Sequence, residues 1–312
     1  MQTNIIFDTR ASGKLLLTGE YFVLDGAYAL ALPVRFGQSL RVEAVQQEGY
    51  FYWNSCDQDG SSWFNVEYEL PYLSVVQTSD RSIAEMLASI IRECQRQNPA
   101  FLKVMGGLKA HTISDFPRAW GLGTSSTLIA AIARWAQVDP YPVLRNTLGG
   151  SGYDIACAYA ESPLLYRIVN DKPEVRCVTF DPPFTHQLYF VYLEKKQNSR
   201  EGIALYREKS KEIKRLIPDI STLTERILNA DTLHSFEKLL FEHESLIADA
   251  LDFQRVKNRL FNDYWGEIKS LGAWGGDFVL ATSSEPESST RQYFSDRGFN
   301  TVLTWKEMVP PL

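Results

Sequence analysis

The segment Trp120-Gly121-Leu122-Gly123-Thr124-Ser125-Ser126 is the most informative stretch of this chain. Its two glycines let the backbone approach a ligand closely and adopt angles that other residues avoid. The Thr-Ser-Ser run can cap a helix, and the Ala/Ile/Leu-rich residues 127–137 predict that a helix follows. A helix start has unpaired N–H groups and partial positive charge, which suit phosphate. No Gly-Lys-Ser/Thr follows, so this is not a Walker A loop, and a tight loop with an ordinary serine cap is the alternative.

Three further segments have similar features. The carboxylate of Asp154, in Gly150-Ser151-Gly152-Tyr153-Asp154, lies at a predicted helix start. It is either an acidic residue that simply favours a helix start, or the general base or metal partner of a phosphoryl acceptor. The segment from Lys269 to Asp277 contains a glycine cluster that also suits a helix end and a turn into a strand. Near the N-terminus, Lys14 lies in a predicted strand, where a solvated lysine is the alternative to a catalytic one.

The overall pattern mixes strands and helices without strict βαβ alternation, which indicates an α+β architecture. Predicted strands cover residues 14–18, 28–45, 102–113 as a pair, 164–169, 175–180, 187–193, 278–281 and 301–305. Predicted helices cover residues 82–97, 127–137, 153–161 and 291–296. The pattern is also helical from about residue 199 to 271, including 233–251 and 255–271, whereas residues 65–79 are expected to be irregular. Pro182-Pro183 is the predicted boundary between two domains.

Length and charge narrow the class of protein. A chain of 312 residues usually forms two domains. The net charge of -6 leaves no basic excess for a nucleic-acid or anionic-membrane partner, so an anionic substrate would need local cations. No leader pattern and no apolar run of about 18 residues is present, which favours the cytoplasm. The cysteines at 56, 94, 157 and 177 form no C-x-x-C pair and are expected to be buried free thiols.

The order and spacing of these segments resemble the GHMP family of small-molecule kinases, which includes galactokinase, homoserine kinase, mevalonate kinase and phosphomevalonate kinase. Ser12-Gly13-Lys14 followed by Gly19-Glu20 is similar to the first motif of that family. Pro117 followed by the segment 120–127 is similar to the second motif. Gly272-Ala273-Trp274-Gly275-Gly276 is similar to the third, so the resemblance extends over residues 10–282.

Within the phosphomevalonate and mevalonate kinase branch, further details resemble phosphomevalonate kinase more than mevalonate kinase. Tyr21 follows Glu20, where mevalonate kinases usually have His, and residues 152–156 resemble a Gly-Phe-Asp-Val-Ala motif. Residues 139–151 contain no Glu, although mevalonate kinases tend to have a metal-binding Glu before the Asp. Trp274 stands where the family has glycine, and a large ring there could crowd the phosphate channel or reshape the acceptor pocket.

The resemblance implies a two-lobed α+β fold, with an N-terminal β-α-β nucleotide-binding lobe over residues 1–183 and a C-terminal ferredoxin-like lobe over residues 184–312. It implies transfer of the γ-phosphoryl group of ATP, with Mg²⁺, to a small anionic acceptor. Phosphomevalonate or mevalonate, from the isoprenoid precursor pathway, is the expected acceptor. A diphosphomevalonate decarboxylase and an ATP-binding pseudoenzyme are the alternatives, and either a monomer or a homodimer is expected.

The resemblance also implies roles for individual residues. Lys14 and Asp154 are the expected catalytic residues, with Lys14 holding Asp154 ionised, and Ser126 and Asp154 are the expected metal ligands. The expected phosphate-binding residues are Gly121, Leu122, Gly123, Thr124, Ser125, Ser126, Gly272, Ala273 and Gly275. The expected acceptor-binding residues are Glu20, Arg118, Ser199 and Arg200, with Lys195 and Lys196 as further candidate cations. The adenine pocket is expected within residues 50–80, where Trp53, Trp63 and Phe64 are equally compatible with a plain core.

Overall fold

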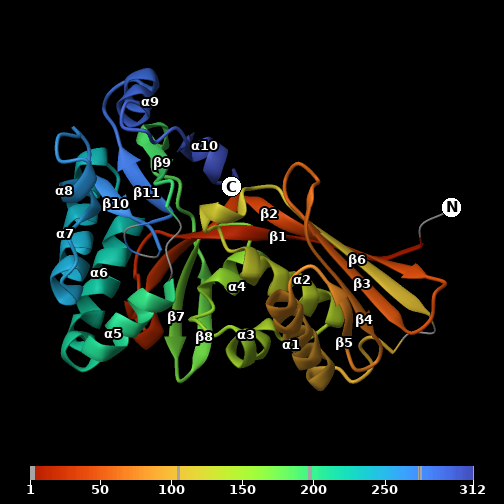
Figure 1. The fold of residues 1–312 in the computed structure, drawn as a ribbon. Helices are drawn as coiled ribbons and strands as arrows, with labels where there is room; N and C mark the ends of the chain where they lie inside the picture. The colour runs from red at the N-terminus through yellow and green to blue at the C-terminus, as the bar shows by residue number, and fades with distance from the viewer. Residues whose placement is uncertain (1–3, 104–105, 196–198, 273, 275, 312) are drawn as a thin grey trace. The chain divides into compact units, whose positions relative to one another are not determined.

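The chain forms the elements shown in Figure 1, a computed structural model that describes residues 4–103, 106–195, 199–272, 274 and 276–311. The strands are β1 Asn4–Leu16, β2 Ala29–Val45, β3 Tyr50–Cys56, β4 Ser62–Glu69, β5 Ser74–Thr78, β6 Gly107–Ser114, β7 Leu164–Val169, β8 Lys172–Cys177, β9 Leu188–Tyr192, β10 Ile268–Ser270, β11 Phe278–Thr282 and β12 Val302–Thr304. The α-helices are α1 Arg81–Gln97, α2 Thr124–Ala136, α3 Pro140–Thr147, α4 Tyr153–Tyr159, α5 Ser199–Ile213, α6 Ile217–Leu228, α7 Leu233–Leu251, α8 Val256–Leu260, α9 Glu287–Ser295 and α10 Trp305–Met308.

These strands form a large mixed sheet and a smaller one. The large sheet has the order β5-β4-β3-β6-β2-β7-β8, with β1 paired to β2 beside this path. Its β3–β6 pair is parallel, and its other registered pairs are antiparallel. The small sheet is antiparallel, with the order β10-β11-β9-β12. The predicted α+β class is therefore confirmed.

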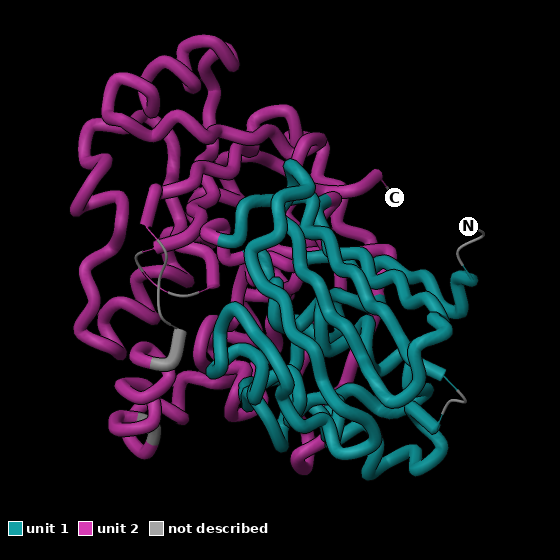
Figure 2. The backbone as a smooth tube through the Cα atoms, turned by 45° about the vertical axis from the view of Figure 1, so that its right-hand side comes forward, with its two compact units in different colours: residues 1–13, 36–118, 122–159 teal, residues 14–35, 119–121, 160–312 magenta. Residues whose placement is uncertain are grey.

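The chain divides into two compact units, which Figure 2 distinguishes by colour. Unit 1 comprises residues 1–13, 36–118 and 122–159, and unit 2 comprises residues 14–35, 119–121 and 160–312. This grouping differs from the predicted lobes, because residues 14–35 and the β7–β8 pair belong with the C-terminal half. The chain thus passes from one unit to the other within β1, within β2 and within the glycine segment.

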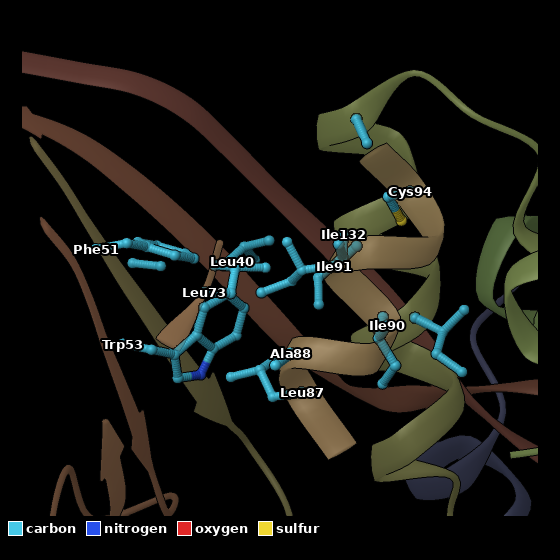
Figure 3. Packing of buried hydrophobic residues seen from close by; sticks show 14 of the residues in the cluster. Leu40, Phe51, Trp53, Leu73, Leu87, Ala88, Ile90, Ile91, Cys94 and Ile132 are labelled. Carbon is cyan, nitrogen blue, oxygen red and sulfur yellow. The ribbon is translucent and has the colours of Figure 1, made fainter. Parts of the chain in front are cut away.

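Unit 1 is organised by the packing of α1 and α2 with its strands. Asp80 caps α1, because its carboxylate accepts the N–H of Ile83 at 3.0 Å. The buried face of α1 includes Leu87 and Ile91, and it shares one apolar core with Phe51 and Trp53 of β3 (Figure 3). The buried Trp53 and Phe64 belong to this core, which supports the plain-core alternative for these two rings.

Unit 2 combines the small sheet with helices that include α6 and α7, which pack side by side (Figure 1). Thr232 caps α7 by accepting the N–H of Ser235 at 3.3 Å. The buried positions of α7 follow the helical repeat and bring this helix against β10. They are Phe236, Leu239, Leu240, His243, Glu244, Ile247, Ala248 and Leu251.

Several predicted elements differ from the structure where pairing is non-local. Residues 65–79 contain most of β4 together with β5, which pair with each other. Among the described residues of the range 102–113, the structure has one strand, β6, in place of the predicted pair. The predicted helix over residues 255–271 ends at Leu260, and its last part is β10. Residues 268–270 are Ile-Lys-Ser and all buried, so neither the two-residue period of a strand nor the 3.6-residue period of a helix is visible in them. Helix α3 was not predicted.

The cysteine prediction is confirmed for three of the four thiols. Cys56, Cys94 and Cys157 are buried and free, whereas Cys177 on β8 is free but exposed. Within the described parts of the chain, none of the helices combines the length and the apolar character needed to cross a membrane.

Candidate functional site

The first and second glycine motifs meet in unit 2. Lys14 lies near the end of β1, and its Nζ donates to the carbonyl oxygen of Gly121 at 2.8 Å. Gly121 has a φ of 68°, a left-handed conformation that glycine adopts without the strain that a Cβ imposes. The strand lysine that the sequence singled out is therefore directed at the start of the glycine loop.

The third glycine cluster reaches the same point through Asp277. A Cβ placed on Gly121 would lie 2.3 Å from the carboxyl carbon of Asp277, so any larger residue there would displace this carboxylate. The backbone of Asp277 is fixed next to β9, because its N–H donates to the Lys195 carbonyl at 2.7 Å and its carbonyl accepts the Leu193 N–H at 2.8 Å. Segments of three sequence motifs are thus brought together around Gly121.

Aromatic packing seats the residues that precede Gly121. The Trp120 ring lies edge-on to Phe278 of β11, with centroids 5.5 Å apart, and 6.4 Å from Tyr192 of β9. The Tyr192 hydroxyl donates to the Ala119 carbonyl at 3.1 Å. The small sheet therefore fixes where the glycine loop begins.

The glycine loop continues in unit 1 as the start of α2. Gly123 is the N-cap residue with a φ of 97°, and no side chain caps the helix there. The Ser126 hydroxyl donates to the Gly123 carbonyl at 2.8 Å, and the Thr127 hydroxyl donates to the Gln38 side chain at 2.9 Å. Because no side chain caps this helix start, the geometry is compatible with the predicted anion site, which stays a prediction.

Asp154 lies in the first turn of α4 in unit 1, as predicted, and its side chain is half-buried. Its Oδ1 accepts the N–H of Ile155 at 2.9 Å. No cluster of three His, Cys, Asp or Glu residues suited to a metal occurs among the described residues. A metal here would therefore need oxygen ligands from a bound phosphate, as is usual for Mg²⁺ in nucleotide enzymes.

Two predicted acceptor-binding residues already have strong partners. In unit 1, the Arg118 guanidinium binds Asp57 through two hydrogen bonds of 2.8 and 3.3 Å and lies 4.1 Å above the Trp63 ring. In unit 2, the Glu20 side chain is fully buried and paired with Lys269. The acceptor-binding roles of Arg118 and Glu20 stay predictions.

The electrostatics around Glu20 follow from its burial. Loss of solvation raises the pKa of the Glu20 carboxyl to about 7, and the nearby Lys269 ammonium opposes this shift. Burial, together with the same ammonium, lowers the pKa of His243 well below its usual value, so this ring is neutral. Burial likewise raises the pKa of Glu244.

Other predicted ligand residues are only partly described. Gly272 has a φ of 65°, and a Cβ added there would meet no atom within 4 Å. Ala273 and Gly275, Lys196, and the side chains of Ser199 and Arg200 lie outside the described residues. Their predicted roles stay predictions.

The Trp274 side chain packs into the core of unit 2. It is 6% exposed and shares a buried apolar cluster with Tyr21 and Phe22. Its ring centroid lies 5.6 Å from that of Phe253, and its Nε1 donates to the Gln254 carbonyl at 3.2 Å. The ring therefore fills the interior of unit 2, and its effect on a phosphate channel or an acceptor pocket stays a prediction.

Sequence reasoning missed Asp277, His243 and Glu244 as candidate functional residues. Asp277 closes the third glycine cluster, and its position directly after two glycines was the available signal. His243 and Glu244 are polar residues at positions where the helical repeat of α7 expects apolar ones. Buried polar residues at such positions need specific partners, and that requirement could have singled them out.

No protein-family model and no curated protein matches this chain by sequence. Its fold, however, is similar to several solved structures. Mevalonate kinase from Methanococcus jannaschii is 18% identical, with a TM-score of 0.68 and coverage of 95% of this chain and 96% of that one. Phosphomevalonate kinase from Streptococcus pneumoniae, in complex with phosphomevalonate and AMPPNP, is 14% identical, with a TM-score of 0.72 and coverage of 96% and 100%. Mevalonate diphosphate decarboxylase from Legionella pneumophila is 16% identical, with a TM-score of 0.59 and coverage of 95% and 99%.

Proposed function

Since this chain has the fold of the GHMP small-molecule kinases, we propose that it transfers the γ-phosphoryl group of ATP to a small anionic acceptor. The observation that carries this proposal is the convergence on Gly121, where Lys14 binds the carbonyl and Asp277 packs against the α-carbon. A nucleotide kinase needs a cation and a glycine-lined backbone at one place, because phosphoryl transfer depends on positioning and charge stabilisation.

The residues present fit a Mg–ATP complex. The uncapped start of α2 offers N–H groups to phosphate oxygens. Ser126 donates its hydroxyl proton to Gly123, which leaves the lone pairs of its oxygen to face a cation. Asp154 would supply a carboxylate ligand. When bound, Mg–ATP supplies the phosphoryl group and neutralises part of its charge.

The side chains of the protein would then have separate tasks. The Lys14 ammonium supplies positive charge beside the glycine loop. Asp154 accepts the proton of an attacking hydroxyl when the acceptor is an alcohol. A phosphate acceptor is already anionic, so Asp154 would matter less as a base in that case. Phosphomevalonate and mevalonate are the acceptors that we propose, because solved structures with this fold include kinases named for these two compounds.

The test is a coupled ADP-release assay with Mg–ATP against mevalonate, phosphomevalonate, homoserine and galactose in parallel. Turnover with mevalonate or phosphomevalonate supports the proposal and identifies the branch. Release of carbon dioxide from diphosphomevalonate would instead favour the decarboxylase activity for which one similar structure is named. If the protein binds Mg–ATP but turns over none of these substrates, the pseudoenzyme alternative is favoured. One reason for that alternative was the replacement of a motif glycine by Trp274, and the burial of this side chain weakens that reason.

A further inference from the structure

Unit 2 buries a group of charged side chains that the proposed chemistry does not use directly. Glu20, His243, Glu244 and Lys269, here called the buried charge network, are each at most 1% exposed. Arg255 and Glu267 flank this network and bind each other at 2.5 Å, and Arg255 Nε also lies 3.6 Å from Glu244. Burying charges is costly even when they are paired, so a network of this kind is weak evidence for a role in stability.

Helix α7 holds two distant loops through consecutive residues. The Gly19 N–H donates to His243 Nε2 at 3.0 Å, and the Ser270 N–H donates to Glu244 Oε1 at 2.9 Å. Because Nε2 accepts a hydrogen bond, the neutral His243 ring carries its proton on Nδ1. One turn of α7 therefore fixes the backbone of the first motif and the backbone that enters the third glycine cluster.

A charged pair joins the same two loops directly. Lys269 Nζ binds the Glu20 carboxylate and also donates to the Ser270 carbonyl at 2.9 Å. Hydrogen bonds that involve charged groups are shorter and stronger than neutral ones. The two loops are thus connected twice, once through His243 and Glu244 of α7 and once directly through Lys269 and Glu20. We call these contacts together the circuit.

Both tied segments lead directly to candidate ligand residues. The turn that contains Gly19 and Glu20 follows the strand that carries Lys14, and Ser270 precedes the glycine cluster that ends at Asp277. A further contact joins the same segments, since the Trp274 N–H donates to the Tyr21 hydroxyl at 3.0 Å. Displacement of either segment would therefore move groups that converge on Gly121.

We propose that His243 and Glu244, together with the Glu20–Lys269 pair, are positioning residues that hold the first motif and the third glycine cluster in register for phosphoryl transfer. This inference rests on the proposed kinase function. Phosphoryl transfer is sensitive to position, and a misplacement of about 1 Å can cost on the order of 100-fold in rate. On this proposal the buried charge network acts through the loops, and Glu20, which is buried and paired with Lys269, holds its turn in place instead of binding the acceptor.

The kinetic test compares substitutions that remove or keep one link. Glu244→Leu removes the acceptor for the Ser270 N–H, whereas Glu244→Gln keeps an oxygen at that place. We expect Glu244→Leu to lower kcat by at least about 10-fold, and Glu244→Gln to stay within about threefold of the wild type because its retained hydrogen bond costs little. KM for Mg–ATP should change less than kcat. Equal losses in the two variants would overturn the proposal.

A double variant separates positioning from stability. Glu20→Leu with Lys269→Met removes both charges at similar volume, and such replacements are often neutral or stabilising. We expect its unfolding temperature to equal or exceed that of the wild type while kcat still falls. An unchanged kcat would overturn the proposal. This variant also carries the test if Glu244→Leu does not fold.

Amide hydrogen exchange supplies a readout that needs no turnover. Glu244→Leu should accelerate exchange in residues 268–272 and, through the circuit, in residues 16–22, with helix α1 as the unchanged control. Acceleration in residues 268–272 alone, or in neither segment, would show that the loops are not coupled and would overturn the proposal. If the wild-type protein phosphorylates no acceptor, the proposed function fails, and the exchange result still decides whether the network couples the two segments.

Discussion

Trp274→Gly introduces the residue that the GHMP motif has at this position, and the structure predicts that it will damage the protein. The Trp274 side chain is 6% exposed and packs against Phe253. Truncating a buried tryptophan typically costs about 3–5 kcal/mol, and glycine adds up to about 1 kcal/mol through the flexibility of the unfolded chain. For a unit of this size, about 2–4 °C is lost per kcal/mol, so the melting temperature should fall by roughly 6–24 °C.

The assay is thermal and urea unfolding followed by circular dichroism, with ADP release measured on the same samples. Trp265→Gly is the matched control, because Trp265 is 42% exposed and should cost less than half as much. We expect no gain of turnover in Trp274→Gly. A melting temperature equal to that of the wild type, together with faster turnover or tighter Mg–ATP binding, would refute the reasoning and place the ring in a ligand channel.

Three further predictions follow from particular contacts. Lys14→Met and Asp154→Asn should each lower turnover on the order of 100- to 1000-fold with an unchanged circular dichroism spectrum, and near-normal turnover in both would contradict their catalytic roles. Gly121→Ala should destabilise by about 1–3 kcal/mol more than Gly149→Ala, because both glycines have a φ near 70° but only Gly121 faces a carboxylate; equal costs in urea unfolding would exclude that contact. Folding raises the pKa of the Glu20 carboxyl, so the folded state binds more protons than the unfolded state. The wild type should therefore lose stability relative to Glu20→Gln as the pH rises from 4.5 past about 7, by roughly 1–3 kcal/mol in unfolding free energy. A difference in unfolding free energy that stays constant over this range would contradict the burial of an ionisable Glu20.

The sequence by itself determined the features that depend on local pattern. Periodicity placed α1 and α7 to within a residue at each end, because an apolar face recurs over several turns in each. The glycine spacing around Gly121 and Gly123 predicted a phosphate-binding loop at a helix start, and α2 does begin there. Each of these signals depends only on residues that are close together in the sequence, so the sequence alone is sufficient to detect it.

Only the tertiary structure decided which motifs meet and where large side chains point. Gly121 contacts Asp277, and Glu20 pairs with Lys269. The two residues of each pair are far apart in the sequence. Trp274 occupies a motif position, yet its ring packs in the core of unit 2 because Tyr21 and Phe253 provide apolar surface there. His243 and Glu244 differ from solvated helix residues only in what lies opposite them. Local sequence cannot report such partners, because hydrogen bonds and packing between distant segments depend on the folded arrangement of both.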